Sequence, residues 1–219
     1  MRRLFLLFAV YLLLCGRSYA GPLTLEEVWR IVEASSPALR TAEAKLASTR
    51  GVVLLSGGNL FCTYFHSTCG GSTERADLFF PVPQMAPLSG RPCEYCAGSR
   101  WSAWQAEISK QDLCTRLGVK DVSGLAIVEK TPGIHALKIQ AGGKSWNGLD
   151  FRLAVGPDRL FSTAFDVEDR GASYLFRGRG YGHGVGLCQV GSRGMAELGY
   201  EASDILNYYY PSAEILRVY

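Results

Sequence analysis

Short apolar or alternating stretches dominate the chain between Val122 and Phe176. The segments LAIVEK, IHALKIQ, LDFRLAVG and STAFDVE follow one another there, and glycine-containing breaks separate them. Such runs, bounded by turn residues, are typical of β-strands. We therefore predict a meander of antiparallel strands. An earlier hairpin is predicted where GVVLL and LFCTYF flank Ser56-Gly57-Gly58-Asn59.

Helical patterns are few and short. Thr24 and Glu27 form a capping box ahead of an apolar face, which predicts a helix ending near Ala34. A weaker helical stretch is predicted for residues 38–48, and the segment that contains Cys114 also looks helical.

A final helix is predicted for DILNYYY, with Ser203 as its N-cap and Pro211 as its end. Residues 81–99 are rich in proline and glycine, which predicts irregular structure. Together these elements predict one α+β domain over residues 21–219, made mainly of antiparallel strands with a few short helices.

The first twenty residues have a different pattern. Two arginines precede the apolar run Leu4–Leu14, and Ser18-Tyr19-Ala20 follows it. This order is typical of a secretory signal peptide, and the run is short for a membrane span. We expect cleavage after Ala20, with a retained N-terminal anchor as the alternative. Export would place the protein in the periplasm or on the cell-wall side of the membrane.

The composition changes this picture little. Of 219 residues, 47% are hydrophobic and 20% are charged, which is ordinary for a globular protein. The chain has 23 basic and 20 acidic residues, and three of the basic ones are arginines within residues 1–20. The remainder has no net charge, so we expect no nucleic-acid partner.

Histidine and cysteine form two closely spaced pairs, His66 with Cys69 and Cys93 with Cys96. Each pair leads into a glycine-containing turn, so four ligands could converge on one structural zinc ion. Disulfides, a redox pair at Cys93 and Cys96, and a His66 ring that faces a substrate are the alternatives. Two further cysteines are expected to be buried as small apolar groups, Cys62 and Cys114.

Three segments carry a resemblance to a known family: FHSTCGGSTERADLFF, FRLAVG and FRGRGYGHGVGLCQVGSRGMAELGYEASDILNYYYP. They resemble the stage II sporulation protein D family, also called the amidase-enhancer type, over roughly residues 47–218. The resemblance implies a lytic transglycosylase that acts on denuded peptidoglycan glycan strands, in sporulation, cell division or cell-wall remodelling. It also implies cooperation with a cell-wall amidase and, in some members, a zinc site near the HSTCGG loop.

The glycine-rich segment then becomes a candidate glycan-binding groove. Its glycines would let the backbone and the ring of His183 approach a sugar, with Tyr181 as an aromatic face. His183 and Gln189 would supply hydrogen bonds. The alternative is a tight strand-to-helix connection in which His183 only satisfies backbone groups.

Lytic cleavage also requires a carboxylic acid that protonates the glycosidic oxygen and, as a carboxylate, then assists attack by a muramic hydroxyl. The family's glutamate lies in a Val-Ala-x-Glu-Met-Pro segment that is not found here. Glu74, in the GGSTE loop, is the best candidate, with a surface or structural carboxylate as the alternative. Three glutamates of the first predicted helix are expected to be solvated or capping charges, Glu26, Glu27 and Glu33.

Three explanations for the unfound segment remain open. The chain is a transglycosylase-like enzyme whose acid is a different residue, or a non-catalytic glycan-binding module that recruits or enhances an amidase. The third is a true start further upstream, with a misleading signal-like segment.

Overall fold

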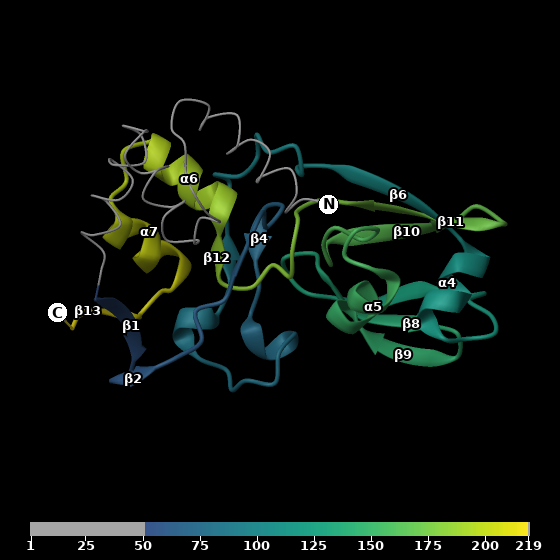
Figure 1. The fold of residues 1–219 in the computed structure, drawn as a ribbon, viewed down its shortest axis with the longest axis horizontal. Helices are drawn as coiled ribbons and strands as arrows, with labels where there is room; N and C mark the ends of the chain where they lie inside the picture. Colours follow the sequence, from purple (N-terminus) through teal and green to yellow (C-terminus); the bar gives the residue numbers. More distant parts are fainter. Residues whose placement is uncertain (1–50, 219) are drawn as a thin grey trace, which may run out of the picture. The chain divides into compact units, whose positions relative to one another are not determined.

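The structure is a computed structural model that describes residues 51–218. Residues 53–218 form one compact unit, in which four α-helices accompany many short, mainly antiparallel strands (Figure 1). This confirms the predicted α+β class. The predicted signal peptide and the first two predicted helices lie outside the described residues. Within residues 51–218, no helix is both long enough and apolar enough to cross a membrane.

Two three-stranded antiparallel sheets supply most of the regular structure. One has the order β10-β11-β6, from β6 (Trp104–Ser109), β10 (Phe165–Asp169) and β11 (Ser173–Gly178). The other has the order β7-β8-β9, from β7 (Ala126–Lys130), β8 (Ala136–Ala141) and β9 (Lys144–Asn147). The strands predicted at LAIVEK, IHALKIQ and STAFDVE are confirmed as β7, β8 and β10.

Helices α4 (Lys110–Leu117) and α5 (Gly148–Val155) pack with these sheets around the first hydrophobic core (Figure 1). Its fully buried side chains include Leu113, Phe151 and Phe176. The helix predicted at Cys114 is α4, where Cys114 is half-buried against this core.

The segment LDFRLAVG is the helix α5, so its prediction as a strand is wrong. The side chain of Asn147 accepts a hydrogen bond from the backbone N–H of Leu149 at 2.9 Å and caps the helix. Four of its five buried residues recur every three to four positions, at Gly148, Phe151, Arg152 and Val155, and Leu149 is the fifth. An apolar run this short fits either a strand or a helix. Here the N-cap and the helical spacing of the buried residues identify it as a helix.

A second core is built from shorter elements. Its strands are β1 (Val52–Ser56), β2 (Asn59–Leu60), β3 (Phe65–His66), β4 (Ser72–Thr73), β5 (Arg91–Pro92), β12 (Leu187–Cys188) and β13 (Glu214–Arg217). They pair as β13-β1-β2, β4-β5 and β12-β3, of which the last is parallel. The helices beside them are α6 (Gln189–Glu197) and α7 (Ala202–Tyr209), with 3₁₀ turns η1 (Ala76–Leu78) and η2 (Ala86–Leu88).

The predicted hairpin is present as β1 and β2. Gly57 and Gly58 both have positive φ, 55° and 74°, as its two-residue turn requires. The second strand is only Asn59–Leu60, because the rest of LFCTYF leaves the sheet. Cys62 is exposed in this irregular stretch, so the prediction that it is buried is wrong.

The helix predicted at DILNYYY is confirmed as α7, but its N-cap is Glu201. The backbone N–H of Glu201 donates to Oδ2 of Asp204 at 3.1 Å, three residues on. Ser203, the predicted cap, lies inside the first turn. The prediction placed the cap two residues late because an acidic residue at the third helical position can satisfy the N-cap backbone.

Candidate functional site

The glycine-rich segment lies directly against the HSTCGGSTE loop. Thr68 and Tyr181 exchange two backbone hydrogen bonds, at 3.0 and 2.7 Å. The backbone N–H of Glu74 donates to the carbonyl of Gly184 at 2.8 Å. Further on, β12 runs parallel to β3. Two motifs that lie far apart in the sequence therefore form one structural unit.

The glycines of this segment are packed against the protein's own histidines. Gly182 and Gly184 have φ values of 120° and 81°. A Cβ at Gly182 would lie 2.7 Å from Cβ of His66, and one at Gly184 would lie 2.5 Å from Cε1 of His135. Glycine is required at both positions because the chain itself fills the space beside the backbone.

His183 is half-buried, and the backbone engages both nitrogens of its ring. Its Nδ1 accepts a hydrogen bond from the N–H of Val185 at 3.1 Å. Its Nε2 therefore carries the hydrogen and donates to the carbonyl of Phe65 at 3.0 Å. Burial lowers the pKa of His183, which keeps the ring neutral. This geometry is that of the tight connection, the alternative that the sequence left open.

Tyr181 and Gln189 lie in different surroundings. The ring of Tyr181 is half-buried and stacks on Trp101, with centroids 4.7 Å apart and planes 17° apart. Gln189 is exposed at the first position of α6. In the part of the chain that the structure describes, neither they nor His183 line the pocket that Glu74 lines or the two pockets that adjoin it. Their substrate-binding roles stay predictions.

Glu74 is a buried carboxyl group, with 4% of the residue exposed. Its Oε1 accepts a hydrogen bond from Oγ1 of Thr131 at 2.8 Å, and this Oγ1 accepts one from the N–H of His135 at 3.0 Å. Gly133 lies so close that a Cβ there would overlap Oε1. Burial raises the pKa of Glu74, and the hydrogen bond from Thr131 opposes this rise.

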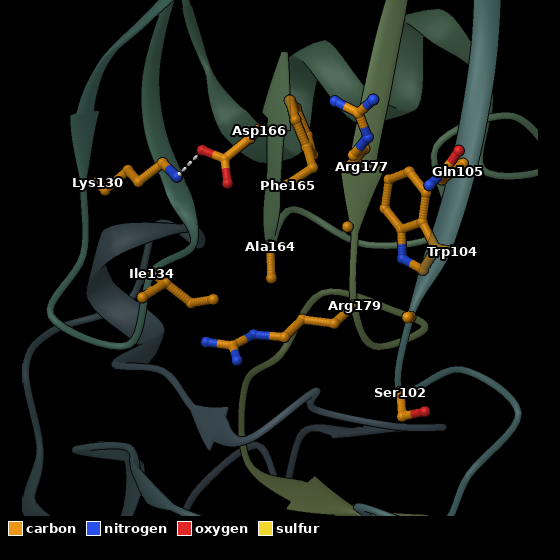
Figure 2. A pocket seen from close by; sticks show the side chains of 12 residues that line it. Ser102, Trp104, Gln105, Lys130, Ile134, Ala164, Phe165, Asp166, Arg177 and Arg179 are labelled. Atoms are coloured by element: carbon orange, nitrogen blue, oxygen red, sulfur yellow. Dashed lines mark hydrogen bonds and ion pairs between the residues drawn. The ribbon is translucent and has the colours of Figure 1, made fainter. Parts of the chain in front are cut away.

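Glu74 lines a pocket of about 490 Å³ that shares lining residues with two others, of about 740 and 520 Å³. Arg179 lines all three pockets, and Figure 2 shows its side chain in the largest one. Ile134 lines two of them and has a positive φ of 76°, a strained conformation for a β-branched residue. The loop of residues 131–134, which contacts Glu74, therefore has an unusual backbone conformation at the pocket wall.

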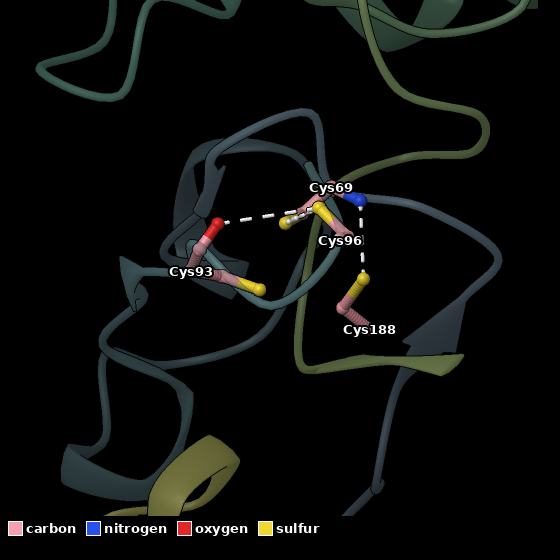
Figure 3. A group of neighbouring side chains, drawn as sticks. All are labelled: Cys69, Cys93, Cys96 and Cys188. Atoms are coloured by element: carbon pink, nitrogen blue, oxygen red, sulfur yellow. Dashed lines mark hydrogen bonds between the residues drawn. The ribbon is translucent and has the colours of Figure 1, made fainter. Parts of the chain in front are cut away.

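Four buried cysteines form a second site, shown in Figure 3: Cys69, Cys93, Cys96 and Cys188. Their sulfurs all lie within 4.8 Å of one another. The cysteines are free, and the sulfurs of Cys69 and Cys96 are 3.4 Å apart. A tetrahedral zinc ion with bonds of about 2.3 Å would hold its sulfurs about 3.8 Å apart. The donor set therefore fits a structural metal ion.

Hydrogen-bond donors lie close to two of these sulfurs. Cys188 Sγ accepts hydrogen bonds from the backbone N–H groups of Cys69 and Gly191, both at 3.3 Å. The hydroxyl of Tyr209 lies 3.1 Å from Cys93 Sγ. Hydrogen bonding among the four thiols lowers the pKa of Cys93 and Cys96 and raises that of Cys69 and Cys188. Such contacts are typical of metal-bound cysteines.

Three of the four predicted metal ligands come together here, and the sulfur of Cys188 joins them. The cysteine spacing could not reveal Cys188, because it lies far along the chain and has no near partner. Its only signal was its place inside the segment that resembles the family. Cys93 and Cys96 are 1% and 2% exposed, which does not suit a redox pair.

His66 is buried beside this group. Its Nδ1 lies 3.0 Å from the carbonyl of Val185, so Nδ1 carries the hydrogen and donates it. Its Nε2 is buried and has no hydrogen-bond partner among the described residues. Burial lowers the pKa of His66 to about 3, so the ring is neutral. Its role as a ligand stays a prediction.

The chain was compared with protein families and with curated proteins. No family model matches it. It is 30% identical to stage II sporulation protein D of Bacillus amyloliquefaciens and 32% identical to that of Bacillus subtilis, in each case over 78% of this chain and 49% of the relative. It is also 36% identical to the amidase enhancer of Bacillus subtilis, over 30% of this chain and 9% of that protein.

The chain thus spans about half the length of the two stage II sporulation protein D relatives. The similarity covers most of the described unit and confirms the resemblance that the sequence motifs indicated. The chain is therefore homologous to the stage II sporulation protein D and amidase enhancer proteins, the family that its sequence resembles.

Proposed function

We propose that this chain binds peptidoglycan glycan strands outside the cytoplasm and cuts them as a lytic transglycosylase, with Glu74 as the acid and base. One observation carries the proposal. Glu74 is a buried carboxyl group with a raised pKa at the wall of a pocket. A raised pKa keeps a carboxyl protonated at higher pH, as a general acid requires. The names of the relatives support a role at the cell wall.

The proposed reaction needs one carboxyl group and no water. Thr131 donates to Oε1 of Glu74, so the transferable proton lies on Oε2. That proton passes to the glycosidic oxygen as the bond from this oxygen to C1 of the muramic residue breaks. The C6 hydroxyl of the same residue then bonds to C1, and its proton returns to Glu74. The products are a strand with a 1,6-anhydro-muramic end and a strand with a free glucosamine hydroxyl.

We also propose that the four-cysteine site holds a structural zinc ion. The ion would link the loop that contains Cys69 to the turn of Cys93 and Cys96 and to Cys188, the N-cap of α6. Cys69 lies only one short strand before Glu74, so the ion would fix the loop that carries the acid.

The cleavage test uses the purified chain with denuded and with stem-bearing glycan strands, and detects anhydro-muramic ends by mass spectrometry. We expect such ends from denuded strands. Glu74→Gln should reduce their rate of formation by about 100-fold or more, because general acid–base catalysis contributes this much. Glu129→Gln is the matched control, since Glu129 is an exposed strand residue outside the three pockets. If Glu74→Gln forms anhydro-muramic ends at the wild-type rate, Glu74 is not the catalytic acid.

A second candidate function is a non-catalytic glycan-binding module that enhances an amidase. The burial of Glu74 favours it, because a carboxyl group with 4% exposure has little room to meet a glycosidic oxygen. The name of one relative, amidase enhancer, points the same way. Two results together would support this candidate over the enzyme. The glycan strands would bind the chain without gaining anhydro-muramic ends, and the chain would speed the release of stem peptides by an added cell-wall amidase.

A further inference from the structure

Arg179 lies where the pocket of Glu74 meets the two neighbouring pockets. It follows directly after β11, and it is the only residue that lines all three pockets within residues 51–218. Figure 2 shows its side chain extending across the largest pocket toward the side where Ile134 lies. A glycan strand that extends from the pocket of Glu74 into either neighbouring pocket would pass the guanidinium of Arg179.

The backbone of Arg179 is fixed on both sides. Its N–H donates to the carbonyl of Ala164 at 2.9 Å, and its carbonyl accepts a hydrogen bond from Oγ of Ser162 at 2.6 Å. The stem of the side chain crosses Gly70, where a Cβ would lie 3.0 Å from Cγ of Arg179. The guanidinium is therefore presented to the pockets from a rigid base.

The other cations that line these pockets already have partners. The pairs are Lys130 with Asp166, Arg177 with Glu168, Arg75 with Asp77, and Arg91 with the carbonyl of Tyr208. Arg179 is exposed, and its guanidinium has no hydrogen bond or ion pair with any residue in the described range 51–218. A guanidinium presents a planar fork of donors that matches a carboxylate. The junction therefore offers one free site for an anion with two oxygens.

We propose that Arg179 binds the lactyl carboxylate of a muramic residue and thereby selects denuded strands. The inference rests on the proposed function. On a denuded strand each muramic residue has a free carboxylate, whereas on a stem-bearing strand the same carbon is part of a neutral amide. Arg179 and Glu74 line one pocket, so a muramic residue whose glycosidic bond meets Glu74 would have its carboxylate in the pocket that Arg179 lines. The bidentate pair forms only with the denuded strand.

The test compares two ligands that differ only at this group. Denuded strands are used as they are, or after conversion of their lactyl carboxylates to methylamides, and binding to the full chain is measured by titration. We expect the wild-type chain to bind the carboxylate form about tenfold more tightly, as a charge-assisted bidentate pair provides. Arg179→Gln should bind both forms equally. Arg179→Lys should keep part of the preference, because it keeps the charge and loses the fork.

The matched control is Arg170→Gln, which removes the same charge from an exposed arginine paired with Glu168 outside the three pockets. It should keep the full preference. Equal binding of the two ligands by the wild-type chain, which needs no variant, would overturn the inference and leave the proposed function intact. A preference that persists in Arg179→Gln would also overturn it. Failure to bind either ligand would overturn the proposed function, and the inference with it.

Discussion

At the scale of single residues, the chemistry of the site depends on how Glu74 is enclosed. The GGSTE motif places Glu74 after a tight loop, and this much could be predicted from the sequence. The burial could not, because its causes lie elsewhere in the chain. Thr131 and Gly133 belong to the loop after β7, and Gly184 belongs to the glycine-rich segment. In the sequence each looks like an ordinary turn residue, because its contact with the carboxyl group exists only in the folded chain.

The raised pKa of Glu74 predicts a pH-dependent stability. The folded state holds the proton more tightly than the unfolded chain, whose glutamate pKa is about 4.3. As the pH rises from about 4 through the raised folded pKa, the native state must carry a buried charge and its stability falls. Glu74→Gln cannot ionise there. We expect its melting temperature to rise relative to that of the wild-type chain as pH increases, measured in matched thermal scans.

The control for this prediction is Glu129→Gln, whose melting temperature should track that of the wild-type chain at every pH. Curves for Glu74→Gln and the wild type that stay parallel from pH 4 to pH 8 would show that the carboxyl group has an ordinary pKa.

At the scale of elements, the apolar pattern of the sequence predicts β7, β8 and β10 but not β6, β9 or β11, the other strands of the two larger sheets. It fails at α5, where a short apolar run fits either period and only the cap at Asn147 distinguishes them. The sequence also gives no sign that Cys188 lies beside the other three cysteines, because those belong to distant turns. The glycine-rich segment was recognised as special from the sequence, but the neighbours that require its glycines were not predictable locally.

The packing of that segment predicts a large cost for Gly184→Ala. The new Cβ would meet the ring of His135 while φ stays at 81°, so we expect a loss of more than about 2 kcal/mol in the free energy of unfolding. Gly171→Ala is the matched control. Its φ is 80° and no heavy atom lies within 4 Å of the added Cβ, so only the backbone strain of about 1 kcal/mol applies.

Chemical denaturation of both variants measures the difference. Equal losses for Gly184→Ala and Gly171→Ala would show that the contact with His135 does not constrain the segment.

At the scale of the whole molecule, the four cysteines bring together segments that lie far apart in the sequence. The elements around the second core are strands of two to five residues and short helices. Small elements bury little apolar surface, so the proposed metal ion would contribute a large share of their stability. The site thus connects the HSTCGGSTE loop, the turn of Cys93 and Cys96, and the start of α6.

Metal removal is therefore expected to destabilise the fold. The purified chain should contain about one zinc ion per molecule, measured by elemental analysis, and a strong chelator should lower its melting temperature. Cys188→Ser should lose the ion. Cys114→Ser, at a half-buried cysteine of the first core, should retain it. A metal-free wild-type chain with an unchanged melting temperature would contradict the proposed site.

The central claim is that Glu74, whose burial raises the pKa of its carboxyl group, cuts the glycan strand. The most direct measurement is the rate at which anhydro-muramic ends form from denuded strands as a function of pH. We predict a rate that falls as the pH rises through a pKa above the ordinary glutamate value, because only the protonated carboxyl can donate to the glycosidic oxygen. Glu74→Gln should bind the same strands and form almost no ends. A rate that is independent of pH, or one that Glu74→Gln retains, would contradict this account.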